Sequence, residues 1–229
     1  MVQPERNDDA ADDARDAEIA SRERSPDRVA AFVDAVFAIV ITILVLEIGV
    51  PSNLSEQSFR EALDEIGPTL IAWVISFFLV GMYWVWHRDL FNRLRAVNRD
   101  VVWLNLVFLV PVSLIPFASA VLGDYHDDPI ALRLYGLVLI AVSLTKIALY
   151  WYIHRRPYLL LTPSSDRTFR IGVGISAAPI ALYVLAMALA DVAHQLSLIV
   201  FLAVPGSYFL LVTLLRERPA TAAGADQFS

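Results

Sequence analysis

The stretch RVAAFVDAVFAIVITILVLEIGVP, residues 28–51, decides the fold class. It is long and apolar enough to cross a bilayer, whose hydrocarbon core requires about 20 such residues in a helix. It nevertheless carries Arg28 and Asp34 near one end and Glu47 near the other. An ionised side chain is costly in hydrocarbon, so we expect a structural or functional reason for each of these charges.

The rest of the chain repeats this apolar character. Of its 229 residues, 57% are hydrophobic, which is high for a soluble domain. The composition predicts an all-α integral membrane protein with one transmembrane domain over residues 28–216 and no soluble catalytic module. Six windows reach the length of a membrane helix, at about 28–50, 69–87, 101–122, 130–153, 169–191 and 195–215.

The two ends of the chain differ from this domain. Residues 1–27 are rich in aspartate and are predicted to form a disordered acidic tail, and residues 217–229 a second disordered tail. The absence of cysteine excludes disulfides, thiolate metal sites and a cysteine nucleophile. The sequence has no phosphate-binding glycine loop and no His-Glu-x-x-His zinc motif. We expect no enzymatic activity, cofactor, metal site or nucleic-acid partner.

Arginine alternates between the loops and so predicts the orientation. By the positive-inside rule, the arginine-rich side faces the cytoplasm, and both termini are predicted to be cytoplasmic. The arginines on that side are Arg88, Arg93, Arg95, Arg99, Arg155, Arg156, Arg167, Arg170, Arg216 and Arg218. The opposite side has only Arg60 and Arg133.

The external segment LSEQSFREALDEIGP, residues 54–68, has its own periodicity. Phe59, Leu63 and Ile66 follow the spacing of one helix face. This predicts a short amphipathic helix at the outer surface that ends at Gly67-Pro68. An ordinary capping loop and a segment that guides ions are both compatible with the pattern.

Two basic side chains within the predicted helices have alternative roles. Lys146 lies about two turns from the cytoplasmic end of window 130–153, where its long stem could snorkel to the interface. Used together with Asp34, it would instead suit a secondary or proton-coupled transporter, although the sequence shows no convincing internal repeat. His87, at the end of window 69–87, is either an interface anchor or a functional partner.

A helical wheel of the first window separates two faces. Asp34 lies about 140° from Ile39, which directs the carboxylate towards neighbouring helices. We name His87, Trp103 and Asn105 as its candidate polar partners. Phe32, Ile39 and Leu46 follow one another at intervals of seven residues, a repeat that is typical of helices packed lengthwise around an axis. The residues that lie within about 40° of Phe32 on this face are Ile39, Ile43, Leu46 and Val50, with Thr42 at the flank.

Three motifs carry a family resemblance. They are the pattern R-x-x-x-F-x-D formed by Arg28, Phe32 and Asp34 before LVLEI, and the segments WVWHRDLFNRL and WLNLVFLVPVSLIPF. Together they cover about 28–121 and resemble the bacterial members of the endosomal/lysosomal transmembrane potassium channel family. One position departs from the family signature Phe-Ser-Asp, since Val33 stands here in place of the serine.

The resemblance implies a potassium-preferring cation channel in the cytoplasmic membrane of a prokaryote. It implies a homotetramer of six-helix subunits in which the first helix of each subunit lines a central pore for K⁺. The family's first hydrophobic constriction corresponds to Ile39, and the layers above it to Ile43 and Leu46, with Thr42 at the flank. Arg28, Phe32 and Asp34 would hold this helix in the bundle.

Overall fold

The computed structural model describes residues 25–49, 56–162 and 165–216. The predicted tails therefore lie outside the described residues, apart from Ser25, Pro26 and Asp27. The described chain forms the helices α2 (Pro26–Leu46), α3 (Glu56–Phe91), α4 (Arg99–Ser113), α5 (Ile115–Asp124), α6 (Pro129–His154), α7 (Asp166–Leu189) and α8 (His194–Arg216). A short 3-10 helix, η1 (Pro157–Leu159), and an isolated bridge between Leu94 and Leu160 complete it.

The predicted all-α membrane fold is confirmed. In the described residues, five spans are long and apolar enough to cross a bilayer: Pro26–Leu46, Ile66–Phe91, Arg99–Asp124, Pro129–His154 and Asp166–Leu189. The sixth predicted window, 195–215, corresponds to α8. The protein is therefore a multi-pass membrane protein.

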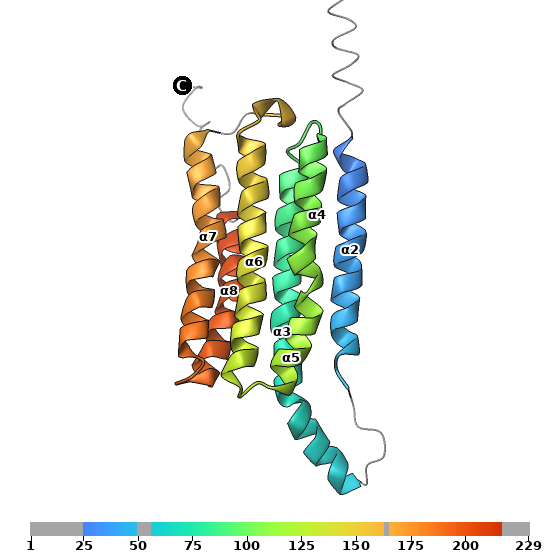
Figure 1. Ribbon diagram of the computed structural model, residues 1–229, viewed down its shortest axis with the longest axis vertical. Helices are drawn as coiled ribbons and strands as arrows, with labels where there is room; N and C mark the ends of the chain where they lie inside the picture. Colours follow the sequence, from blue (N-terminus) through green and yellow to red (C-terminus); the bar gives the residue numbers. More distant parts are fainter. Residues whose placement is uncertain (1–24, 50–55, 163–164, 217–229) are drawn as a thin grey trace, which may run out of the picture.

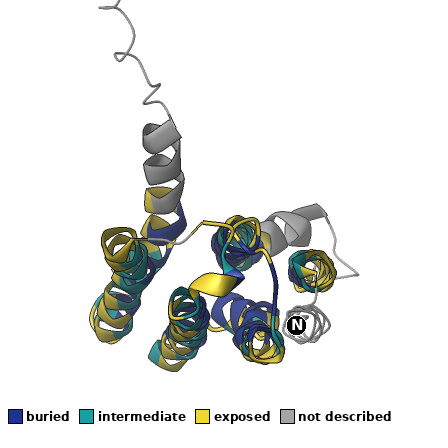
Figure 2. Ribbon diagram, turned by 90° about the horizontal axis from the view of Figure 1, so that it is seen from above, coloured by how far each residue is buried: buried dark blue, intermediate teal, exposed yellow. Residues whose placement is uncertain are grey.

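The helices stand side by side, with α2 at one edge of the bundle and α7 and α8 at the other (Figure 1). Helix α2 packs against α3, α4 and α5, whereas α6 packs against α4, α5 and α7. Helix α8 packs against α7 and also contacts α3. Seen from above, the buried residues gather where neighbouring helices meet (Figure 2). This order places α2 away from the C-terminal helices.

Polar side chains define where the helices begin. Ser25 accepts a hydrogen bond from the backbone N–H of Asp27, and Asn98 accepts one from Val101 at 3.0 Å. Each satisfies a backbone N–H that has no partner within its own helix. Helix α2 ends at Leu46, four residues before the end of the predicted window, with Glu47 as its C-cap.

The N-terminal part of α3 corrects one prediction. The helix does not end at Gly67-Pro68 but runs from Glu56 through both residues to Phe91. Figure 1 shows the segment before this point inclined to the rest of α3. Proline removes one backbone hydrogen bond and bends a membrane helix without having to end it.

The third predicted window, 101–122, consists of two helices. Helix α4 ends at Ser113 and α5 begins at Ile115, with Leu114 as the residue between them. Pro111 and Pro116 flank this break. Because Pro116 has no N–H, the helical hydrogen bond that it would donate is missing, which favours a break there.

Hydroxyl groups link the helices inside the apolar core. Ser76 of α3 donates to Ser119 of α5 at 2.9 Å and lies 2.8 Å from the hydroxyl of Tyr135 in α6. The hydroxyls of Tyr83 and Tyr183 lie 3.1 Å apart and connect α3 to α7. These pairs satisfy polar groups that water cannot reach and fix which helix faces meet.

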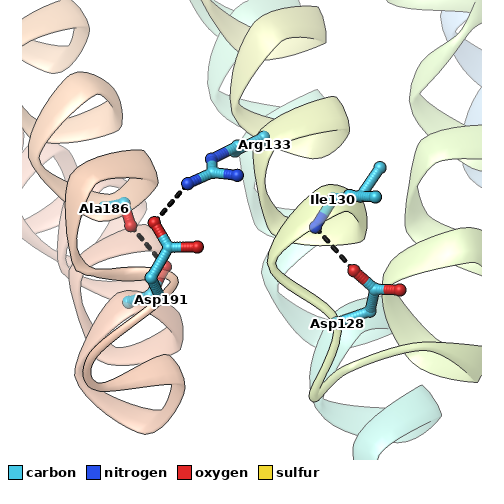
Figure 3. Close-up of polar contacts among 6 residues, drawn as sticks. Asp128, Ile130, Arg133, Ala186 and Asp191 are labelled. Carbon is cyan, nitrogen blue, oxygen red and sulfur yellow. Dashed lines mark hydrogen bonds and ion pairs between the residues drawn. The ribbon is translucent and has the colours of Figure 1, made fainter.

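A second set of polar contacts holds the opposite end of the bundle from the N-terminus of α2 (Figure 3). Arg133 of α6 forms an ion pair with Asp191, just after α7. Asp128 caps α6 by accepting from the N–H of Ile130 at 2.8 Å. The hydroxyl of Ser197 in α8 donates to the carbonyl of Ala186 in α7 at 2.8 Å. Helices α6, α7 and α8 are thereby connected.

Candidate functional site

Helix α2 has one face buried in the subunit and one face that the subunit leaves uncovered. Val33, Phe37, Val40 and Leu44 are all buried, and their spacing is that of a single helical stripe. On the other side the predicted seam is open, with Ile39 57% exposed and Leu46 77% exposed. The exposed members of the seam are Phe32, Ile39, Ile43 and Leu46, whereas Val50 lies outside the described residues.

Thr42 is exposed beside this seam. Its hydroxyl donates to the backbone carbonyl of Ile39 at 2.8 Å, within the same helix. The bond fixes the hydroxyl direction, and its oxygen keeps lone pairs that can accept a further hydrogen bond. Thr42 therefore provides a polar group at the edge of an otherwise aliphatic row.

The hydrogen-bond partner of Asp34 is Trp84 of α3. The indole Nε1 of Trp84 donates to the Asp34 carboxylate at 2.8 Å, and the Arg88 guanidinium lies 5.3 Å from the centroid of the Trp84 ring. This carboxylate thus connects α2 to α3. The bond goes to none of the three predicted partners. Trp84 stands three residues before His87, on the same helical face, which is the signal that could have identified it.

Two of those predicted partners bind each other instead. Nε2 of His87 lies 2.8 Å from Oδ1 of Asn105, and this buried pair connects α3 to α4. The His87 ring stacks on Phe91, with centroids 4.2 Å apart. Trp103, the third candidate, is largely exposed. The structure therefore separates two polar links, one from α2 to α3 and the other from α3 to α4.

The departure from the family signature lies in the core. Val33 is fully buried on the inner face of α2. A hydroxyl at such a place requires a hydrogen-bond partner, because burying it without one is unfavourable. Valine has no such requirement, so the apolar packing of α2 accounts for this residue.

Arg28 and Phe32 border a cavity at the N-terminal end of α2. Its volume is about 600 Å³, and it lies between α2 and α4. The full lining is Ser25, Arg28, Val29, Phe32, Val102, Asn105 and Leu106. This cavity continues the uncovered side of α2 towards the start of the helix.

Lys146 does not snorkel to the end of its helix. Its side chain is 4% exposed, and its ammonium lies 4.8 Å from the ring centroid of Trp86 and 5.9 Å from that of Tyr83. The negative face of an aromatic ring attracts a cation, which explains this position. Lys146 and Asp34 therefore have different partners, Trp86 and Tyr83 for the lysine and Trp84 for the aspartate.

Comparison with known proteins identifies similar chains. The family model described as endosomal/lysosomal potassium channel TMEM175 matches residues 28–116, which extend from α2 into α5. A protein named potassium channel from Streptomyces collinus is 37% identical over 136 residues, which are 58% of this chain and 66% of that protein. The matched region thus spans just under two thirds of that relative's length.

Two matches extend over more of the chain. A protein named potassium channel from Chamaesiphon minutus is 30% identical over 183 residues, covering 74% of this chain and 86% of that protein. The crystal structure of a lysosomal potassium-selective channel TMEM175 homolog from the same organism superposes with a TM-score of 0.72 at 25% identity. That superposition covers 81% of this chain and 97% of the other. Sequence and fold agree over most of both molecules, and the chain belongs to the TMEM175 family.

Proposed function

We propose that the chain forms a potassium-preferring cation channel in which four copies surround a central pore lined by α2. The relatives named potassium channels support the choice of ion and activity. The observation that carries the proposal is the row of exposed Ile39, Ile43 and Leu46 on a helix whose opposite face is buried. Further copies of the same helix around an axis would cover this row.

The proposed constriction follows from the spacing of these side chains. Ile39 and Leu46 are about 10 Å apart along α2, with Ile43 between them. Rings of branched aliphatic groups around a narrow axis exclude water and can gate by dewetting. A cation that passes them must lose part of its hydration without replacement by carbonyl oxygens. Potassium holds its water less tightly than sodium, so it should pass more readily.

The proposed orientation places both termini in the cytoplasm. It rests on the arginine bias between alternate loops, with Arg93 and Arg156 on the cytoplasmic side and Asp127 on the outer side. The proposed location is the cytoplasmic membrane of a prokaryote. In this orientation Arg28 lies near the inner interface, where its guanidinium reaches water or lipid phosphate.

A matched pair of substitutions tests the pore. In Ile39→Asn a polar ring should wet the constriction, raise conductance and weaken the preference for potassium over sodium. Val40→Asn is the control because Val40 is 3% exposed and faces the core of its own subunit. That variant should lower stability and leave selectivity unchanged in the protein that does fold. Reversal potentials in mixed potassium and sodium, measured in planar bilayers, distinguish the two.

The reverse result would contradict the proposal. Unaltered selectivity in Ile39→Asn, together with lost selectivity in Val40→Asn, would place the ions on the other face of α2. If the potassium flux into liposomes saturates and requires a proton gradient, the protein is a carrier rather than a channel.

A further inference from the structure

A second cavity lies at the other side of the bundle from α2. It has a volume of about 290 Å³ and is lined by residues of α3, α6, α7 and α8; Figure 1 shows α7 and α8 at the edge of the bundle away from α2. We call it the Lys146 cavity. Its lining consists of Met82, Tyr83, Ser143, Lys146, Ile175, Ser176, Ala178, Pro179, Leu182, Val204 and Ser207.

The cavity contains one charge. Among the described residues no carboxylate forms an ion pair with Lys146, and the contacts of its ammonium are the faces of Trp86 and Tyr83. The residue lies eight positions before the end of α6 at His154, which is roughly 12 Å along the helix. A basic side chain at this depth is expensive to bury, and such a residue indicates a functional site, for example as the counter-ion of a bound ligand.

The remaining lining is apolar with a few hydroxyls. Ser143 and Ser207 donate to carbonyls of their own helices, so their oxygens keep lone pairs rather than free protons. Met82, Leu182 and Val204 provide an aliphatic wall. A site of this composition discriminates against a strongly hydrated small anion, which would have to shed its water here. It suits a charged head attached to an apolar chain.

The position of α7 gives such a molecule an entrance. Within α7 the buried residues are Ser176, Tyr183 and Ala186, so most of this helix faces outwards. Ile175 and Ala178 line the cavity and are themselves exposed, which brings the cavity to the surface of the subunit at α7. The volume corresponds to about ten water-sized volumes, enough for a carboxylate and several methylenes.

We propose that the Lys146 cavity binds the carboxylate of a fatty-acid-like amphiphile from the bilayer. The ammonium of Lys146 is the counter-ion, the aliphatic wall surrounds the first methylenes, and the rest of the acyl chain leaves along α7. This binding does not depend on ion conduction by α2. It assigns a ligand to a part of the molecule that the pore does not use.

The sequence offers a specific probe, because Lys146 is the only lysine in the chain. The full-length protein, produced with [ε-¹³C]lysine and reconstituted in zwitterionic nanodiscs, gives one lysine resonance. At about pH 7.5 the carboxyl group of decanoic acid is ionised. We expect decanoate to shift the resonance in a saturable manner, whereas decanol of the same chain length leaves it in place. Loss of the resonance in Lys146→Met assigns it.

Two further variants keep Lys146 and add a large side chain, one at the mouth of the Lys146 cavity and one beside it. Ala178→Trp should fill the mouth of the cavity and weaken decanoate binding at least tenfold. Gly174→Trp is its matched control, one turn earlier on α7, where a Cβ meets nothing within 4 Å. It should bind as the unsubstituted protein does. Equal shifts from decanol, from acetate, or in Ala178→Trp would each overturn the proposal. None of these measurements uses ion flux, so the binding proposal can be tested even if the proposed channel function is wrong.

Discussion

At the residue scale, the hydrogen bond between Trp84 and Asp34 predicts how α2 is held. Trp84→Phe keeps an aromatic ring but removes the Nε1 donor that lies 2.8 Å from the carboxylate. The loss of a hydrogen bond to a charged group should lower stability by about 1.5 kcal/mol, the low end of the usual range, because Asp34 is exposed. Because the bond lies between α2 and α3 rather than on the exposed seam, potassium preference should be unchanged. Thermal unfolding in detergent and reversal potentials measure the two effects.

Trp103→Phe is the control for this change, because Trp103 is exposed and was the competing candidate. It should leave the melting temperature of the solubilised subunit nearly unaltered. Asp34→Asn keeps an acceptor for Trp84 but removes the charge, and should impair assembly before it alters ion preference. A well-assembled Asp34→Asn protein without cation preference would put the carboxylate in the ion path and refute the structural role.

At the scale of elements, the close contact between α5 and α3 predicts that two glycine-to-alanine substitutions will have different effects on stability. A Cβ at Gly123 would lie 2.9 Å from the backbone Cα of Thr69, so Gly123→Ala must push the two helices apart. Overpacking of this kind costs about 1–3 kcal/mol. At Gly81 nothing lies within 4 Å of an added Cβ, and Gly81→Ala should be neutral or stabilise by up to ~1 kcal/mol. Melting temperatures that fall equally in both would contradict this.

The elements also show which features a sequence can reveal. Bilayer thickness sets the length of a membrane helix, so the six windows could be found from hydropathy alone. The break at Leu114 and the continuation of α3 through Pro68 could not, because a proline can bend, break or end a helix depending on its neighbours. The helical face of α3 that carries His87 also carries Trp84, so the sequence could indicate the face but not which of the two side chains meets Asp34. The contact between Trp84 and Asp34 joins residues 50 positions apart, and the packing of α2 on α3 decides it.

At the scale of the whole molecule, the proposed pore requires several copies of the chain. A single subunit of 25.5 kDa leaves the seam of α2 uncovered, so we expect the solubilised particle to contain four subunits. Light scattering with correction for bound detergent measures the protein mass directly. A monomeric particle that still conducts potassium would contradict a pore built from α2.

The proposed orientation is tested at the same scale, and the chain has no cysteine to interfere. A cysteine introduced at Asp127, between α5 and α6, should react with an impermeant thiol reagent applied outside intact cells. Arg156→Cys, between α6 and η1, should react only after permeabilisation. Labelling of Arg156→Cys in intact cells would reverse the assigned orientation.

The edge position of α2 has a consequence for biosynthesis. The main packing partners of α2, which are α3, α4 and α5, end by Asp124, so these contacts can form before the second half of the chain has been completed. The N-terminal part of a nascent chain folds first as synthesis proceeds. We therefore expect α2 to dock while α6, α7 and α8 are still leaving the ribosome. A nascent chain whose residues up to Asp124 have left the ribosome should already hold α2 in place, whereas the Lys146 cavity can form only after α8 has been released.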